Sequence, residues 1–223
     1  GTGSRPCPIR PGPSSIRSAP TPTSSRRAST TCSSGDPDAV AVNASIPARI
    51  LRVNHGGEHG AVSIYSAQIL VARLRAPDLL PFLREALAHE RTHRARFRAL
   101  MPARQSKPCR LMWIWVVGGS VLGLATGLLG REAILACTQA VEETVHRHLD
   151  DQVRWSTGRD EELRRTVEDI RAEEQGHIRY AVEQRRGRGF RWLKELIAGA
   201  TEALIWASTR GDSVRLSRQL ATT

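Results

Sequence analysis

Glu90-Arg91-Thr92-His93 returns 84 residues later as Glu174-Gln175-Gly176-His177. Each Glu-x-x-His copy has a further glutamate 32 residues upstream: Glu58 precedes the first copy and Glu142 precedes the second. All three pairs of corresponding residues are therefore separated by the same 84 positions. Scattered acids and imidazoles rarely keep one interval over such a distance, so the sequence predicts an internal duplication of a helical hairpin.

Apolar residues recur around both motifs at intervals of three and four, which is the spacing of one face of an amphipathic helix. Leu83 and Phe97 mark this face in the first copy, and Leu163 and Ile170 mark it in the second. Six polar residues fall on the apolar faces of four successive helices: Glu58, Glu90, His93, Glu142, Glu174 and His177. We therefore expect an all-α four-helix bundle with four carboxylates and two imidazoles in its core.

Buried carboxylates without partners cost several kcal/mol each or take up protons. Four glutamates carry four negative charges, which two divalent cations would neutralise. One Glu from each of two helices, with Glu-x-x-His from each of the other two, is the ligand set of the ferritin-like carboxylate proteins. One imidazole per metal favours iron or manganese over calcium or magnesium. A single Glu-x-x-His is common on solvated helices, but the duplicated set on apolar faces predicts a dinuclear metal site.

Longer motifs surround these residues. The first is Arg52-Val53-Asn54-His55-Gly56-Gly57-Glu58-His59-Gly60-Ala61, and the second is Leu128-Leu129-Gly130-Arg131-Glu132-Ala133, followed by Ala136-Cys137-Thr138 and Ala140-Val141-Glu142-Glu143. They resemble the motifs of the demethoxyubiquinone hydroxylase family, from about Ile46 to the C-terminal helix. The resemblance implies a di-iron monooxygenase that adds the penultimate ring hydroxyl in ubiquinone biosynthesis.

The same resemblance implies cofactors, partners and a location. The metals would be two iron ions held by the six residues named above, and NADH would supply the electrons. The partners would be a polyprenyl demethoxyubiquinone, O2 and a lipid-binding accessory protein of the ubiquinone synthesis complex. The protein would lie peripherally on the matrix side of the mitochondrial inner membrane, or on the cytoplasmic side of a bacterial cell membrane.

The chain departs from the family pattern at three places. His59 replaces an aromatic residue, Gln175-Gly176 replaces Leu-Glu inside the second motif, and Leu149 replaces a tyrosine after His148. None of these changes removes an expected ligand. They change residues beside the expected ligands, and Leu149 offers no phenol for an electron path.

Other residues near the expected site receive weaker assignments. His55 precedes Glu58 by three residues; it is either a ligand or, as we favour, a residue supporting the ligands or the core. Tyr65 and His148 are expected around the metals, His148 by resemblance only. His146 is interpreted as a core histidine. His89 lies about 100° from Glu90 around the helix and is expected to face solvent.

The basic composition does not indicate nucleic-acid binding, although the formal net charge is +11. Residues 1–35 contain five arginines and no acid, so much of the excess charge lies in a tail. This Ser-, Pro- and Arg-rich tail, residues 1–45, is expected to be a mitochondrial targeting segment or a disordered extension outside the bundle domain of residues 46–223. We find no zinc-finger spacing and no RNA-binding signature, so nucleic acid is not an expected partner.

Residues 111–130 carry no charge, and at about 1.5 Å per residue they would extend about 30 Å as a helix. A membrane-spanning helix, an ordinary core helix and a helix resting in one leaflet all fit this stretch. We favour the last, with Trp113 and Trp115 at the membrane interface. Gly119, Gly123 and Gly127 recur at intervals of four and are suited to close helix packing.

The remaining helices are expected at about Pro47–Arg75, Asp78–Leu100, Arg131–Trp155, Asp160–Gln184 and Trp192–Ser208, the last covering the bundle. The function that fits this fold is hydroxylation of a quinone-type ring by a di-iron centre. The alternative is a ferritin- or rubrerythrin-like ferroxidase that handles iron and has no organic substrate. The apolar stretch 111–130 favours the first, because a soluble iron store has no use for membrane contact.

Overall fold

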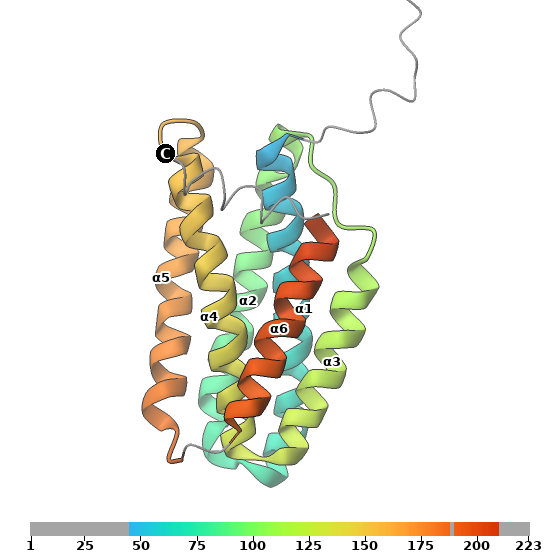
Figure 1. Cartoon of the computed structure of the whole chain (residues 1–223), viewed down its shortest axis with the longest axis vertical. Coiled ribbons are helices and arrows are strands. Elements are labelled where there is room, and N and C mark those ends of the chain that lie inside the picture. Colours follow the sequence, from blue (N-terminus) through green and yellow to red (C-terminus); the bar gives the residue numbers. More distant parts are fainter. Residues whose placement is uncertain (1–44, 188–189, 210–223) are drawn as a thin grey trace, which may run out of the picture. The chain divides into compact units, whose positions relative to one another are not determined.

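The computed structural model describes residues 45–187 and 190–209, and all regular elements in this part of the chain are helical (Figure 1). The α-helices are α1 (Ile46–Arg75), α2 (Leu80–Leu100), α3 (Met112–Leu129), α4 (Arg131–Ser156), α5 (Glu161–Gln184) and α6 (Arg191–Thr209). Two 3-10 turns, η2 (Pro77–Leu79) and η3 (Pro102–Arg104), follow α1 and α2. The predicted helices are confirmed to within a few residues, and the expected tail lies outside the described residues except for Ser45.

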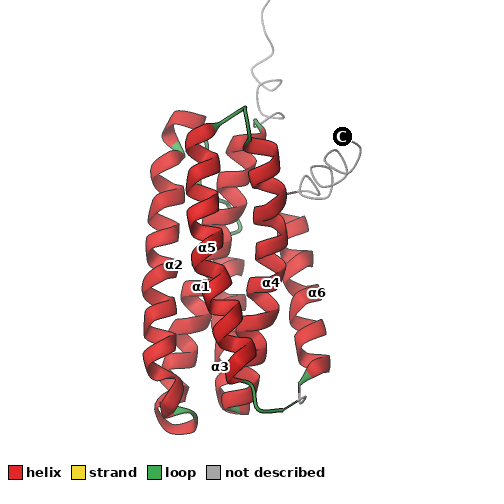
Figure 2. Ribbon diagram, turned by 90° about the vertical axis from the view of Figure 1, so that its left-hand side faces the viewer, coloured by secondary structure: helices red, strands yellow, loops and turns green. Residues whose placement is uncertain are grey.

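Two antiparallel hairpins, α1–α2 and α4–α5, form the ferritin-like bundle (Figures 1 and 2). The hairpins meet through contacts between α2 and α5 and between α1 and α4. Helix α3 is the long crossover between them and packs along α1, while α6 packs along α4. Both duplicated hairpins therefore have one additional helix laid against their first member.

The turns between helices follow from local sequence. Pro77 cannot continue the hydrogen bonding of α1, and its ring restricts the backbone of Ala76, which ends the helix. Gly130 joins α3 directly to α4 with a φ of 92°, a left-handed conformation that costs glycine little. Asp160 caps α5, because its side chain accepts a hydrogen bond from the Leu163 amide at 3.1 Å.

Two of the apolar clusters in the core lie at different heights along the bundle. Tyr65, Leu83 and Leu135 belong to one cluster, whereas Phe97 and Leu163 belong to the other. On each of the four bundle helices, the expected metal ligands lie between residues of the first cluster and residues of the second. Apolar layers on both sides therefore separate the polar layer from bulk water.

Helix α3 approaches α1 closely through its glycines. A Cβ on Gly119 would lie 2.5 Å from the carbonyl oxygen of Gly60, and one on Gly123 would lie 2.4 Å from that of Ile64. A Cβ on Gly127 would meet Val71 at 3.0 Å. The expected close packing of this glycine stripe is confirmed, and only glycine allows it at the first two positions.

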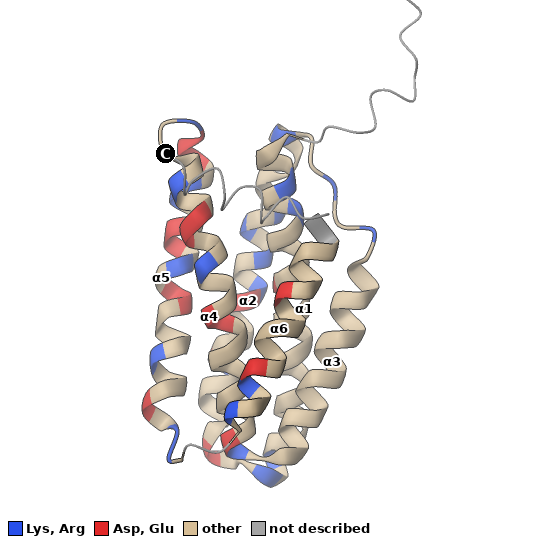
Figure 3. Cartoon of the chain, in the orientation of Figure 1, with Lys and Arg blue, Asp and Glu red and all other residues tan. Residues whose placement is uncertain are grey.

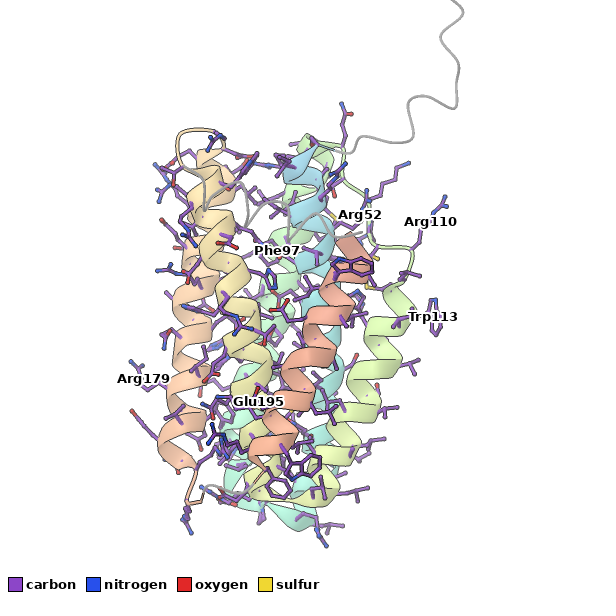
Figure 4. All side chains as sticks on the ribbon, viewed as in Figure 1. Arg52, Phe97, Arg110, Trp113, Arg179 and Glu195 are labelled. Carbon is purple, nitrogen blue, oxygen red and sulfur yellow. The ribbon has the colours of Figure 1, made fainter. Side chains whose placement is uncertain are left out.

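Helix α3 carries no charged residue (Figure 3), and large apolar side chains are exposed along its outward face. Trp113 is 64% exposed and projects away from the bundle, whereas Phe97 lies inside it (Figure 4). The expectation for Trp115 is wrong: its indole is 5% exposed and covers Gly56 and Gly60 on α1. Met112–Leu129 is the one helix in the described residues that is long and apolar enough to cross a membrane, and little of it is buried.

Gly123→Ala is expected to destabilise the protein by roughly 1–3 kcal/mol, because the added methyl group would overlap the backbone of α1. The matched control is Gly118→Ala on the same helix, where nothing lies within 4 Å of the added atom. Since alanine favours a helix over glycine by up to about 1 kcal/mol, the control should be neutral or stabilising. Chemical denaturation measures both, and equal free energies of unfolding for the two variants would contradict this packing.

Candidate metal centre

All six predicted site residues lie in the buried polar layer. Their exposed fractions range from 0% for His93 to 6% for Glu58. Helix α1 supplies Glu58, α4 supplies Glu142, and α2 and α5 each supply one Glu-x-x-His pair. The apolar faces read from the sequence therefore point to a common interior.

The six side chains form two overlapping groups. Potential ligand atoms of Glu58, Glu90, His93 and Glu174 lie within 4.8 Å of one another. The same limit holds for a second group that contains Glu90, Glu142, Glu174 and His177. Glu90 and Glu174 belong to both groups, so their carboxylates would contribute ligands to both metal positions.

Orphaned polar atoms show that this set fits metal ions. Within the six side chains of the cluster, four buried atoms have no hydrogen-bond partner: Glu90 Oε1, His93 Nδ1, Glu174 Oε2 and His177 Nδ1. His93 Nδ1 lies 3.1 Å from Glu174 Oε1 and 3.8 Å from Glu58 Oε2. His177 Nδ1 lies 3.3 Å from Glu174 Oε2 and 3.6 Å from Glu90 Oε1. Since buried polar atoms are otherwise almost always paired, these converging lone pairs suit divalent cations.

Burial makes the cluster take up protons when no metal is present. It raises the pKa of Glu58 to about 7. Burial, reinforced by the charge of Glu174, also holds the pKa values of Glu90 and Glu142 well above their ordinary range. A carboxyl group that loses hydration without gaining a cation retains its proton.

The pKa of Glu174 is lowered and that of His93 is raised, because these two side chains interact with each other. Burial would raise the pKa of Glu174, but the close imidazoles of His177 and His93 outweigh it and lower the pKa below its ordinary value. Burial likewise lowers the pKa of His93, but the carboxylates of Glu174 and Glu58 outweigh it and raise the value to about 9. The metal-free centre therefore holds a Glu174 carboxylate beside a cationic His93.

The outer nitrogens of the two histidines are also engaged. His93 Nε2 lies 3.0 Å from Glu173 Oε2, and His177 Nε2 lies 3.1 Å from His89 Nδ1. The prediction that His89 faces solvent is therefore wrong. Its position on α2 faces the neighbouring helix α5, so the side chain is half-buried against His177.

Tyr65 lies directly beside the cluster. Burial, and after it the charge of Glu142, holds the pKa of Tyr65 well above its ordinary value. The hydroxyl therefore keeps its proton and donates to Glu142 Oε1 at 2.7 Å. This hydrogen bond holds the Glu142 carboxylate beside the cluster, where Oε1 also lies 3.9 Å from His177 Nδ1.

The remaining histidines lie outside the two ligand groups. His55 is buried and packs against His59, with ring centroids 5.4 Å apart. Burial, followed by the charges of His59, Arg98 and Arg94, lowers the pKa of His55 to about 4, so its ring is neutral. His148 Nε2 bonds to Glu202 Oε2 of α6 at 2.9 Å. Half-buried His146 leaves its Nδ1 without a hydrogen-bond partner.

A largely apolar cavity of about 690 Å³ opens onto the cluster. Glu58, Glu90, Glu142 and Glu174 line its inner end, and residues of α3 and α6 form its outer wall. The sequence reasoning did not anticipate the contribution of α6, nor a reciprocal amide pair in the cavity wall. Asn54 Nδ2 donates to Gln152 Oε1 at 2.7 Å, and Gln152 Nε2 donates to Asn54 Oδ1 at 3.0 Å. Their positions beside apolar-face residues on α1 and α4 were the only sequence signal for this pair.

The comparison with known families agrees with the motifs. The family model described as "Ubiquinone biosynthesis protein COQ7" matches residues 45–208, from the start of α1 almost to the end of α6. The chain belongs to the COQ7 family. The match includes both hairpins and the two additional helices α3 and α6, so it covers nearly all of the described residues.

Relatives of this COQ7-family chain have related printed names. The "3-demethoxyubiquinol 3-hydroxylase" of Rhodospirillum rubrum is 38% identical over 164 residues, which cover 73% of this chain and 77% of the relative. Two "NADPH-dependent 3-demethoxyubiquinone 3-hydroxylase, mitochondrial" proteins are each 35% identical. The one from Dictyostelium discoideum covers 73% of this chain and 76% of its own length, and the one from Rattus norvegicus covers 76% and 80%. Two of these names state NADPH where the motifs led us to expect NADH.

The metal-free protein is expected to lose thermal stability as pH rises from about 4.5 to 7. The pKa of Glu58 rises from 4.5 in the unfolded chain to about 7 in the folded protein, so folding favours its protonated form. The stabilisation of the folded state by protonated Glu58 is fully present below pH 4.5 and is lost as pH approaches 7. His93, with a pKa of about 9, extends the loss toward pH 9.

Thermal melts with and without Fe²⁺ under anaerobic conditions measure this dependence. Added metal should restore stability at pH 7, because the cation replaces the protons. Glu58→Gln is the control, and its metal-free melting temperature should vary less over the same window. A melting temperature of the metal-free wild type that stays level or increases from pH 4.5 to 7 would contradict the assignment.

Proposed function

We propose that this chain is a di-iron monooxygenase that hydroxylates the ring of demethoxyubiquinone in ubiquinone biosynthesis. The single observation that carries the proposal is the buried Glu/His cluster at the inner end of an apolar cavity. A metal centre alone fits several activities, but a largely apolar cavity of this size beside it suits an organic ligand. The printed names of the relatives support a demethoxyubiquinone ring as that occupant.

The reaction consumes O2, two electrons and two protons. One oxygen atom replaces a ring hydrogen as a hydroxyl group, and the other leaves as water. The electrons come from a reduced nicotinamide cofactor; our motif-based expectation is NADH, and the names of two relatives support NADPH. Two irons, when bound, supply the activation of O2.

The residues of the chain hold and orient this centre. Glu58 and His93 would hold one iron, Glu142 and His177 the other, and Glu90 and Glu174 would lie between them. The apolar clusters on either side keep bulk water from the irons, which protects the reaction from unproductive loss of electrons. The protein therefore contributes geometry and a dry site.

The apolar surface next to the cavity supports peripheral membrane association. Large apolar side chains are exposed on both helices of the outer wall: Leu111, Trp113, Val116, Val117, Val121, Leu124, Leu128, Leu129, Trp192, Leu196 and Trp206. A polyprenyl tail that leaves the cavity between α3 and α6 would enter lipid directly. The proposed location is the matrix side of the mitochondrial inner membrane, with a bacterial cytoplasmic membrane as the alternative; a lipid-binding accessory protein remains a prediction.

The cavity also separates this function from the iron-handling alternative. A ferroxidase or iron store needs access for small hydrated ions, which a largely apolar cavity does not favour. The wall residues Ile64, Leu122, Ile197 and Leu204 instead suit a hydrophobic ring and chain. Hydroxylation of a quinone is therefore the better-supported function.

The iron-loaded protein, supplied with a short-chain demethoxyubiquinone, NADH or NADPH, and O2, is expected to form a product heavier by one oxygen atom. Glu142→Ala should reduce both bound iron and product below one tenth of the wild-type values. Glu143→Ala is the matched control, because the adjacent side chain faces away from the cluster and pairs with Lys194 at 2.7 Å. Mass spectrometry and iron analysis measure both outcomes.

Full turnover by Glu142→Ala with wild-type iron content would contradict the metal assignment. Two bound irons that oxidise rapidly in air, with no hydroxylated product even in vesicles containing the substrate, would favour the iron-handling alternative.

A Trp113→Asp/Val121→Asp double variant is expected to weaken binding to anionic lipid vesicles by more than about tenfold, since a buried Asp costs about 2.5–3.5 kcal/mol in the membrane. Val182→Asp is the control, because Val182 is an exposed apolar residue on α5. In Figure 1, α5 and α3 lie at opposite edges of the bundle. Vesicle flotation measures the bound fraction, and equal binding of the double variant and the control would argue against α3 as the contact surface.

A further inference from the structure

The two histidines of the cluster differ in the partner of their outer nitrogen. His93 Nε2 faces the Glu173 carboxylate at 3.0 Å, and His177 Nε2 faces the His89 ring at 3.1 Å. We propose that Glu173 and His89 are positioning residues that make the two metal positions unequal, so that the position at His93 binds its metal first and more tightly. This inference rests on the proposed metal centre and deepens it.

The orientation of both rings determines which nitrogen carries the proton. Nδ1 of His93 and Nδ1 of His177 point into the cluster, where each lies within 4 Å of carboxylate oxygens. A nitrogen that binds a metal must offer its lone pair, so the proton of each ring sits on Nε2. Both Nε2–H groups therefore donate outward, to Glu173 Oε2 in one case and to His89 Nδ1 in the other.

These two acceptors affect a metal-bound imidazole differently. A carboxylate acceptor forms a charge-assisted hydrogen bond and pushes electron density into the donating ring, which makes the ring a stronger ligand. A neutral imidazole acceptor does so much less. Glu173 is held in place by Arg96, whose Nη1 lies 3.4 Å from Glu173 Oε1.

The carboxylates of the centre reinforce the same inequality. Each position has three carboxylates, with Glu90 and Glu174 common to both, so their number does not distinguish the positions. The two positions are distinguished by the hydrogen bonds that their unshared ligands make to residues outside the cluster. The Tyr65 hydroxyl donates to Glu142 Oε1 at 2.7 Å and so draws electron density away from a ligand of the His177 position. The contacts of His177 and Glu142 thus weaken metal binding at the His177 position. The contact of His93 with Glu173 strengthens metal binding at the His93 position.

His89 is well placed to maintain this difference. Its ring stacks against His177 at a centroid distance of 5.3 Å and an interplanar angle of 13°. The planes of the His89 and His93 rings are inclined by 26°, and their centroids are 6.3 Å apart. One side chain of α2 thus fixes the ring orientation of a ligand on α5.

Anaerobic calorimetric titration of the metal-free full chain with Fe²⁺ tests the proposal. The wild type should show two binding steps whose dissociation constants differ by more than about tenfold. Glu173→Gln keeps an acceptor but removes its charge, and it should weaken the tighter step by roughly 10–100-fold. His89→Glu introduces a carboxylate acceptor and should tighten the weaker step, which a merely structural disruption would not do.

Two further variants and one control complete the design. His93→Ala should abolish the tighter step, and His177→Ala should abolish the weaker one, which assigns each step to a position. Glu168→Gln, also on α5 and partly exposed in an ion pair with Arg164, should leave both steps unchanged. Circular dichroism of each metal-free variant checks that the helices are retained.

Two equal binding steps in the wild type, an unchanged tighter step in Glu173→Gln, or no tightening in His89→Glu would overturn the inference. These outcomes leave the metal centre itself intact, because two ions still bind. Failure of the proposed function looks different: the wild type would bind no Fe²⁺, or Glu142→Ala would bind two ions as the wild type does.

Discussion

Four carboxylates buried in one layer of a helical core are the constraint on which the rest of the structure depends. Burial, reinforced by the charge of Glu174, raises the pKa values of Glu58, Glu90 and Glu142, so the layer requires either protons or cations. The converging unpaired atoms of the two histidines and of Glu90 and Glu174 favour cations. A bundle of two duplicated hairpins is the simplest frame for such a layer, because each of the four helices supplies one carboxylate and the apolar clusters on either side exclude water.

Helices α3 and α6 lie between the polar layer and the protein surface. The glycine stripe of α3 lets the crossover lie against the backbone of α1, and residues of α3 and α6 line the cavity together with those of α1 and α4. Side chains on the outer faces of the same two helices remain exposed and apolar. The cavity beside the carboxylates therefore lies next to two helices whose outer faces are apolar, an arrangement that suits the proposed membrane-soluble substrate.

Most of the fold and the six central residues could be predicted from the sequence, because helical periodicity and a constant repeat interval are local properties of the chain. The failures concern properties that depend on neighbouring helices. Helical geometry gives the direction of the His89 side chain. It does not reveal that helix α5, rather than water, lies on that side of α2. Residues 111–130 are apolar on every side, so periodicity could not identify the packed face that buries Trp115. The glycine spacing marked that face, and the cavity wall contributed by α6 left no comparable signal.

Mössbauer spectroscopy of the full chain loaded with ⁵⁷Fe tests the central claim most directly, because it counts and distinguishes iron sites without requiring turnover. The account predicts two irons per chain that are magnetically coupled after oxidation, since shared carboxylates hold paired metals about 3.5–4 Å apart. Both signals should disappear together in Glu90→Ala, which removes one of the shared carboxylates. A single iron per chain, or two irons that remain magnetically independent, would contradict the account.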